Sequence, residues 1–216
     1  MNRYNDTLRY LYGLEKFGIV FGLDNIKWIL NLLGNPHKIL KSVHIGGTNG
    51  KGSVASMLSN IFMEGGYRIG KYTSPHLVSF TERITTNEKE ISEEEIVDLT
   101  QFIREKIEND DNKRFFTFFD FTTALAFEYF KRQEVDMAFI EVGLGGRLDS
   151  TNVVEPLACI ITNVERDHTE YLGESLTDIA REKAGIIKNG VPVITGAEGT
   201  ARTVIEEAAQ RQGSAL

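Results

Sequence analysis

The sequence predicts an α/β fold in which a mostly parallel sheet carries helices on both faces. Short apolar runs alternate with longer segments of helical periodicity along most of the chain. Several runs, including 136–144 and 157–164, are apolar almost throughout, which is typical of strands buried on both faces of a parallel sheet. A glycine-rich loop also leads from one run directly into a helical segment, as in P-loop-type folds.

A short helical segment is expected before the sheet. Apolar residues recur at helical spacing over 4–14 and 24–34, and the second segment stops at Gly34. We interpret residues 1–40 as a helical segment that packs on the core. Residues 41–216 are interpreted as the sheet domain.

Within the sheet domain, strands and helices alternate. Strands are predicted over 42–47, 67–74, 136–144, 157–164 and 191–195. Helices are predicted over 52–66, 92–107, 120–132 and 175–190, with a last helix that ends near Gln212. The segment after residue 74 is expected to be a polar loop. A Ser92/Glu95 capping box begins the helix that follows this loop.

Composition restricts the class of protein. The 216 residues are 41% hydrophobic, which is enough for the core of one good-sized domain. Asp and Glu total 31 against 24 Lys and Arg, so a net charge of −7 disfavours broad contact with nucleic acid. No leader is seen at the N-terminus, and no apolar run approaches the roughly 20 residues that span a bilayer. We expect a cytoplasmic protein without membrane or nucleic-acid partners, whose single cysteine, Cys159, is a small buried hydrophobe.

The loop Gly46–Ser53 has the chemistry of a phosphate-binding loop. A strict G-x-x-x-x-G-K-[ST] motif needs Gly at position 45 and Ser or Thr at 52, whereas this chain has Ile45 and Gly52. The physical features remain, because glycines let the backbone approach a phosphate and Lys51 neutralises it. Hydroxyls are available at Thr48, Ser53 and Ser74. The structural alternative is a glycine-rich turn with a surface lysine.

Further polar residues follow two of the predicted strands. Glu141 stands among apolar residues near the end of 136–144, where a carboxylate needs a partner such as Mg²⁺ beside a triphosphate. Asp167 and His168 follow 157–164 and are expected at the same edge of the sheet. A buried, salt-bridged Glu141 and a simple Asp-His turn are the structural alternatives.

Lys183 is predicted to point toward the core. It follows Ile179 by four residues and Leu176 by seven, so it shares their apolar helix face. An inward lysine must reach solvent along its stem, pair with an acid or lose its charge. A neutral buried amine is a nucleophile toward carbon dioxide.

Six stretches in order resemble the bacterial folylpolyglutamate synthase/dihydrofolate synthase family, within the Mur ligase superfamily. They are GGTNGKGS, YTSPHLVSFTERI, FFTFFDFTTALAF, EVGLGGRLDSTN, ITNVERDHTEYLG and IAREKAGIIK. Gly after the loop lysine is this family's own form of the motif. The resemblance implies an ATP-dependent ligase that joins L-glutamate to a folate or dihydropteroate carboxylate through an acyl phosphate.

The resemblance also implies roles for individual residues. Catalytic roles fall on Lys51, His168 and Lys183, with Lys183 expected as an N-carbamate. The ATP phosphates are expected on Thr48, Asn49, Gly50, Lys51, Gly52 and Ser53. Two Mg²⁺ ions are implied, one on Ser74 and Glu141 and a second on His168. The acceptor substrate is expected on Ser74, Pro75, His76, Arg83, Phe119 and Asp149.

Members of this family are about twice as long as this chain, with a C-terminal Rossmann-like domain that is expected to be absent here. Residues 41–216 then correspond to the central ATP-binding domain, with the chain ending inside it or at its end. We expect a monomer that acts on small molecules. Two alternatives stay open: a P-loop kinase or NTPase of another class, and a nucleotide-binding fragment without catalysis.

Overall fold

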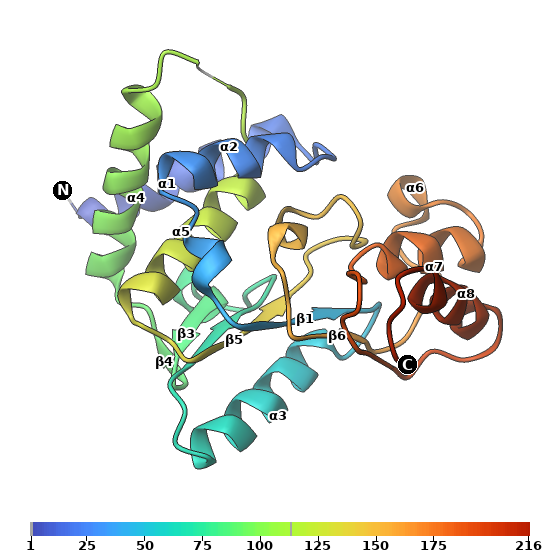
Figure 1. Cartoon of the computed structure of the whole chain (residues 1–216). Coiled ribbons are helices and arrows are strands. Elements are labelled where there is room, and N and C mark those ends of the chain that lie inside the picture. The colour runs from blue at the N-terminus through green and yellow to red at the C-terminus, as the bar shows by residue number, and fades with distance from the viewer. Residues whose placement is uncertain (1, 113) are drawn as a thin grey trace.

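A mixed seven-stranded sheet forms the centre of the computed structural model, which describes residues 2–112 and 114–216 (Figure 1). The strands stand in the order β4-β3-β2-β5-β1-β6-β7. Their bounds are β1 Ser42–Gly46, β2 Ile69–Tyr72, β3 Ile84–Thr86, β4 Lys89–Glu90, β5 Met137–Glu141, β6 Ala158–Ile161 and β7 Val193–Thr195. All pairings from β2 across to β7 are parallel, so the predicted mostly parallel sheet is confirmed.

Strands β3 and β4 correct the prediction of a polar loop after residue 74. They form an antiparallel hairpin on β2. Its two turn residues, Asn87 and Glu88, both have positive φ, which suits the tight turn of a two-residue hairpin. Asn87 also accepts a hydrogen bond from the Ile69 N–H at 2.7 Å. The turn has Asn-Glu where Asn-Gly would be the usual signal, so the hairpin could not be predicted from the sequence.

The predicted helices are present in the predicted order, and one short helix, at Thr169–Leu172, was not predicted. Their bounds are α1 Arg3–Gly13, α2 Asp24–Leu32, α3 Lys51–Glu64, α4 Glu93–Glu108, α5 Phe118–Arg132, α6 Thr169–Leu172, α7 Leu176–Ala184 and α8 Gly199–Arg211. The Ser92/Glu95 capping box is present, and Thr117 with Asp120 forms another at the start of α5.

Helix α7 is shorter than the predicted 175–190. The carbonyls of its last turn are bonded to a loop beyond β5: the Arg147 N–H donates to Glu182 O at 2.8 Å, and Asn152 Nδ2 donates to Gly185 O at 3.1 Å. An added Cβ at Gly185 would collide with Arg147. This close contact ends the helix at Ala184.

Helices cover both faces of the sheet, as predicted. Helix α3 packs on one face through a cluster that includes Ile45, Ala55 and Phe139. On the other face α5 lies at the centre of the largest core cluster, with α1, α2 and α4 around it (Figure 1). A third cluster joins β6 and β7 to α7 and α8 and contains the buried thiol of Cys159, which donates to Ile186 O.

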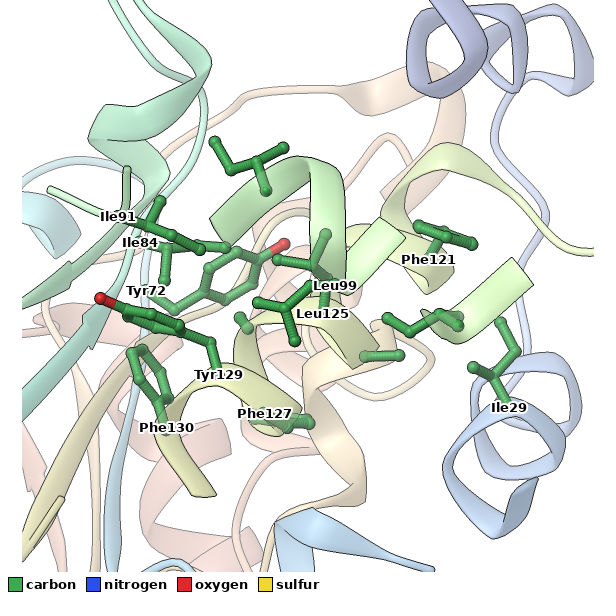
Figure 2. Packing of buried hydrophobic residues seen from close by; sticks show 14 of the residues in the cluster. Ile29, Tyr72, Ile84, Ile91, Leu99, Phe121, Leu125, Phe127, Tyr129 and Phe130 are labelled. Atoms are coloured by element: carbon green, nitrogen blue, oxygen red, sulfur yellow. The ribbon is translucent and has the colours of Figure 1, made fainter. Parts of the chain in front are cut away.

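The core around α5 fixes the N-terminal helices to the sheet. Figure 2 shows Phe121, Leu125 and Phe127 of α5 between Tyr72 of β2 and Ile29 of α2. All five side chains are fully buried. The connection from α1 to α2 is thereby held near the start of α5, where the site described below opens. No helix in the described ranges combines the length and apolar character needed to cross a bilayer.

Candidate active site

The loop between β1 and α3 has the geometry of an anion site. Gly47 and Gly50 both have positive φ, and an added Cβ at Gly47 would overlap Thr162. Helix α3 begins at Lys51, so its free N–H groups face the loop. The Lys51 Nζ donates to the carbonyls of Gly47 and Thr48 at 3.1 Å each. The lysine therefore curls over the loop, where a phosphate would meet its charge.

Residues after β6 hold this loop, and sequence reasoning missed their contribution. The Asn49 N–H donates to Asn163 Oδ1 at 2.8 Å, and Thr162 Oγ1 donates to Asn49 O at 2.6 Å. The hydroxyl of Thr48 accepts from the Glu165 N–H at 3.0 Å. Thr48 and Asn49 thus shape the loop, while Ser53 lies exposed on the first turn of α3. The signal available in the sequence for Thr162, Asn163 and Glu165 was their position directly after a parallel strand.

Glu141 lies beside the phosphate loop at the end of β5. Its side chain is buried, its Oε1 lies 3.9 Å from Lys51 Nζ, and its Oε2 accepts from the Ser74 N–H at 3.3 Å. Burial raises the pKa of Glu141, and the positive charge of Lys51 partly opposes this shift. The predicted neighbourhood of Ser74, Glu141 and Lys51 is therefore present in the fold.

Lys183 points inward, as its helix position predicted, and is 4% exposed. Burial, and then the nearby charge of Lys51, lowers the pKa of Lys183 to about 8, while Asp167 opposes the shift. None of the ion pairs between described residues includes Lys183. His168 has a φ of 49° and its Nε2 lies 3.5 Å from Asp167 Oδ2. The charges of Lys51 and Asp167 thus act on Lys183 in opposite directions.

A cavity of about 400 Å³, called here the aromatic pocket, opens beside Ser74. Its lining residues are Glu15, Gly18, Ile19, Val20, Phe21, Ser74, Pro75, Arg83, Thr117, Phe118, Phe119, Gly143, Leu144, Leu148, Asp149 and Ser150. Five of the six predicted substrate residues are among them. The sixth, His76, does not line the pocket and accepts a hydrogen bond from Arg83 Nε at 2.7 Å.

Arg83 is a buried cation in the wall of the aromatic pocket. It is 7% exposed, and no carboxylate of the described residues lies within ion-pair distance. Its guanidinium carbon lies 5.2 Å from the centre of the Phe118 ring. A guanidinium keeps its charge at all ordinary pH values. An unpaired buried guanidinium in a cavity favours an anionic ligand group.

Asp149 has a structural function that the sequence did not indicate. Its carboxylate accepts from the Leu144 N–H at 2.8 Å, from the Thr151 N–H at 3.0 Å and from the Thr151 hydroxyl. Burial raises the pKa of Asp149 to about 6, although these hydrogen bonds oppose the shift. The side chain therefore organises the loop from 143 to 150 that forms one wall of the pocket.

The segment between α1 and α2 supplies pocket residues that sequence reasoning also missed. Glu15 and residues 18–21 line the pocket, and Ile19, Val20 and Phe21 remain exposed. Positive φ at Gly18 and Gly22 lets this segment turn at both ends. The sequence signal was a short apolar run between two glycines, outside either helical pattern.

Ser74 connects the aromatic pocket with the phosphate loop. It lines the pocket, and its N–H donates to the carboxylate of Glu141, which lies next to Lys51. A ligand carboxylate at this end of the pocket would therefore lie close to a phosphate held by the loop. Phosphoryl transfer between two bound groups requires such a junction.

Comparison with known proteins agrees with this architecture. The sequence profile of the Mur ligase middle domain matches residues 45–215. Dihydrofolate synthase/folylpolyglutamate synthase of Bacillus subtilis is 41% identical over 98% of this chain and 50% of its own length. The folylpolyglutamate synthase structure from Thermotoga maritima has a TM-score of 0.88 at 46% identity, covering 98% of this chain and 48% of that one.

A solved FPGS–AMPPCP–folate complex is also similar, with a TM-score of 0.93 at 38% identity, over 99% of this chain and 53% of that one. The chain thus spans about half the length of the relatives it matches. The profile match nevertheless covers most of the present sequence. By its sequence and fold, the chain belongs to the Mur ligase family, whose middle domain it carries.

Proposed function

We propose that this chain is the nucleotide- and acceptor-binding part of an ATP-dependent ligase that joins L-glutamate to a dihydropteroate or folate carboxylate. The observation that carries the proposal is Ser74, which belongs to the aromatic pocket and also bonds Glu141 beside Lys51. The names of the relatives supply the substrates, since they are folylpolyglutamate and dihydrofolate synthases. The pocket suits a pterin because its walls combine Phe118 and Phe119 with polar groups.

The reaction has two steps. A carboxylate oxygen of the acceptor attacks the γ-phosphorus of ATP, and the bond from that phosphorus to the ADP oxygen breaks. The amine of glutamate then attacks the acyl carbon, phosphate leaves, and the amine nitrogen loses a proton. In the first step Lys51 and the N–H groups at the start of α3 stabilise the negative charge that develops on the phosphoryl oxygens.

The residues present fit a magnesium ion at one position. Ser74 carries a hydroxyl, and its backbone N–H is bonded to the carboxylate of Glu141. Mg²⁺ prefers a few such oxygen ligands supplemented by phosphate and water. When bound, the ion would neutralise phosphate charge. No group of three His, Cys, Asp or Glu side chains within 2–112 and 114–216 is arranged to hold a metal by itself. A second ion near His168 therefore fits only with a further anionic ligand.

We propose that Lys183 supplies this ligand as an N-carbamate. An ammonium at this buried position lies near the positive charge of Lys51, which is unfavourable. Reaction of the neutral amine with carbon dioxide forms an N–C bond, releases a proton and replaces the cation with an anion. The depressed pKa of Lys183 favours the neutral amine that this reaction needs.

The remaining parts of the proposal concern organisation. We regard residues 1–40 as a helical segment packed on the core and 41–216 as the central ATP-binding domain. The protein is proposed to act in the cytoplasm as a monomer on ATP, glutamate and the acceptor, without nucleic acid or membrane partners. Turnover is assigned to this chain together with a partner half equivalent to the part of its relatives that this chain does not match.

For assays we define the extended chain as residues 1–216 followed by the unmatched second half of the Bacillus subtilis relative.

Replacing Arg83 with alanine is expected to weaken binding of dihydropteroate by about tenfold or more, because a buried charge-assisted contact is lost. Affinity for MgATP should change by less than about twofold, since Arg83 does not touch the phosphate loop. Fluorescence titration with dihydropteroate and calorimetry with MgATP measure the two affinities. A pterin without a carboxylate should bind wild type and variant alike.

Arg104→Ala is the matched control, because its guanidinium also lies over an aromatic ring, at 4.4 Å from the Tyr10 centre, on another part of the surface. This variant should alter neither affinity. If Arg83→Ala binds dihydropteroate as wild type does, or loses MgATP affinity equally, the acceptor pocket is placed wrongly.

A further inference from the structure

A buried chain of hydrogen bonds connects the central strand with the aromatic pocket. His44 of β1 is fully buried, and its Nε2 lies 2.8 Å from Thr151 Oγ1. The same hydroxyl is bonded to Asp149 Oδ1, and Asp149 lines the pocket. Neither His44 nor Thr151 lines the pocket itself, and their hydrogen bonds reach it through Asp149.

The direction of these bonds follows from proton counting. An ionised Asp149 only accepts, so the single hydroxyl hydrogen of Thr151 points to its carboxylate. His44 must then donate its Nε2–H to Thr151. Burial, and then the charge of Lys188, lowers the pKa of His44 to about 3, so the ring is neutral and carries one N–H. Its Nδ1 has no partner among the described residues, which agrees with the proton being on Nε2.

Asp149 connects the hydrogen bonds from His44 and Thr151 to the wall of the pocket. Its other oxygen accepts from the Leu144 N–H at 2.8 Å, so the carboxylate ties the beginning of the loop from 143 to 150 to its end. The opposite end of this series of hydrogen bonds lies on β1, which ends at Gly46 and leads directly into the phosphate loop. His44 thus joins the two halves of the site through side-chain bonds.

We propose that His44 is a positioning residue that fixes the acceptor-binding wall relative to the phosphate loop through Thr151 and Asp149. This inference rests on the proposed function, because it takes the aromatic pocket to be the acceptor site. Without the Nε2–H, the hydrogen bond from β1 to the Thr151 hydroxyl is lost, and the wall loses its anchor on β1. The sheet and the phosphate loop keep their own backbone bonds.

The test compares His44→Leu, which removes the donor, with His44→Gln, whose amide can replace the Nε2–H. In the 216-residue chain, His44→Leu is expected to weaken dihydropteroate binding by about tenfold while MgATP affinity stays within about twofold. His44→Gln should recover most of the lost acceptor affinity. His37→Leu is the matched control. His37 is another buried histidine that does not line the pocket, and its Nδ1 has no hydrogen-bond partner within 2–112 and 114–216.

Thr151→Val and Thr151→Ser test the middle residue of this series of hydrogen bonds. They also replace the first test if His44→Leu does not fold. Valine keeps the branched shape and loses the hydroxyl, so it should weaken dihydropteroate binding about as much as His44→Leu, while serine should not. The double variant should be no worse than either single variant, because both interrupt one chain. Additive losses, or losses equal for MgATP and dihydropteroate, would show a general packing role instead.

Nitrogen NMR of the His44 ring provides a separate readout. At about pH 8, where the carboxylate of Asp149 is ionised, the ring should show the proton on Nε2. A proton on Nδ1 at that pH would overturn the proposed direction of the chain. Failure of the proposed function has a different signature: wild type would bind MgATP but not dihydropteroate. Failure of this inference leaves wild-type dihydropteroate binding intact and unaffected by His44→Leu.

Discussion

Replacing Lys51 with methionine is expected to weaken MgATP binding by about an order of magnitude or more. Methionine keeps the apolar stem and removes only the ammonium that lies over the Gly47 and Thr48 carbonyls. The phosphates would then face Glu141 without the cation that now lies 3.9 Å from it. Calorimetric titration of the 216-residue chain with MgATP measures the effect.

Lys71→Met is the control for this experiment, because Lys71 is a lysine of strand β2 whose side chain is buried and paired elsewhere. Its Nζ pairs with Glu88 at 2.9 Å, away from the phosphate loop. Loss of this pair should lower the thermal stability and leave MgATP affinity unchanged. A folded Lys51→Met variant with wild-type MgATP affinity would show that the loop does not bind the nucleotide phosphates.

Replacing Lys183 with alanine is expected to reduce ligation by the extended chain by about a hundredfold or more, because the proposed carbamate would be lost from the metal-binding region. Short carboxylic acids should restore part of the activity, since a carboxylate can enter the vacated space. Removing bicarbonate should lower the activity of the unmodified protein. Mass spectrometry near neutral pH with bicarbonate should detect the carbamate on Lys183.

Lys188 provides the matched comparison, since burial also lowers its pKa and its Nζ donates to Asn152 O at 2.9 Å. Lys188→Ala should show no rescue by carboxylic acids, and Lys188 should carry no carbamate. A fully active Lys183→Ala variant without any additive would refute the proposed role.

The sequence was sufficient for those site residues whose positions follow from local patterns. Glu141 was located because it stands among apolar residues near the carboxyl end of a predicted strand. The inward direction of Lys183 followed from its spacing to Ile179 and Leu176 on one helix face. Both are buried in the structure, as this reasoning predicted.

Other features depend on contacts between distant segments and left little trace in the sequence. The hydrogen bond between His44 and Thr151 joins residues 107 positions apart. The contribution of Glu15 to the pocket depends on how α1 and α2 pack around α5. Helix α7 ends early because a loop from beyond β5 bonds its last carbonyls, which helix periodicity cannot reveal.

The central claim is that an acceptor carboxylate in the aromatic pocket meets the γ-phosphate of ATP at Ser74. The most direct test uses the extended chain with dihydropteroate whose carboxylate carries heavy oxygen, together with MgATP and glutamate. The account predicts that one heavy oxygen per turnover appears in the released phosphate, because the acyl phosphate breaks at its acyl carbon. Glutamylated product formed without heavy oxygen in the phosphate would contradict the account, and so would ATP hydrolysis that never requires the acceptor.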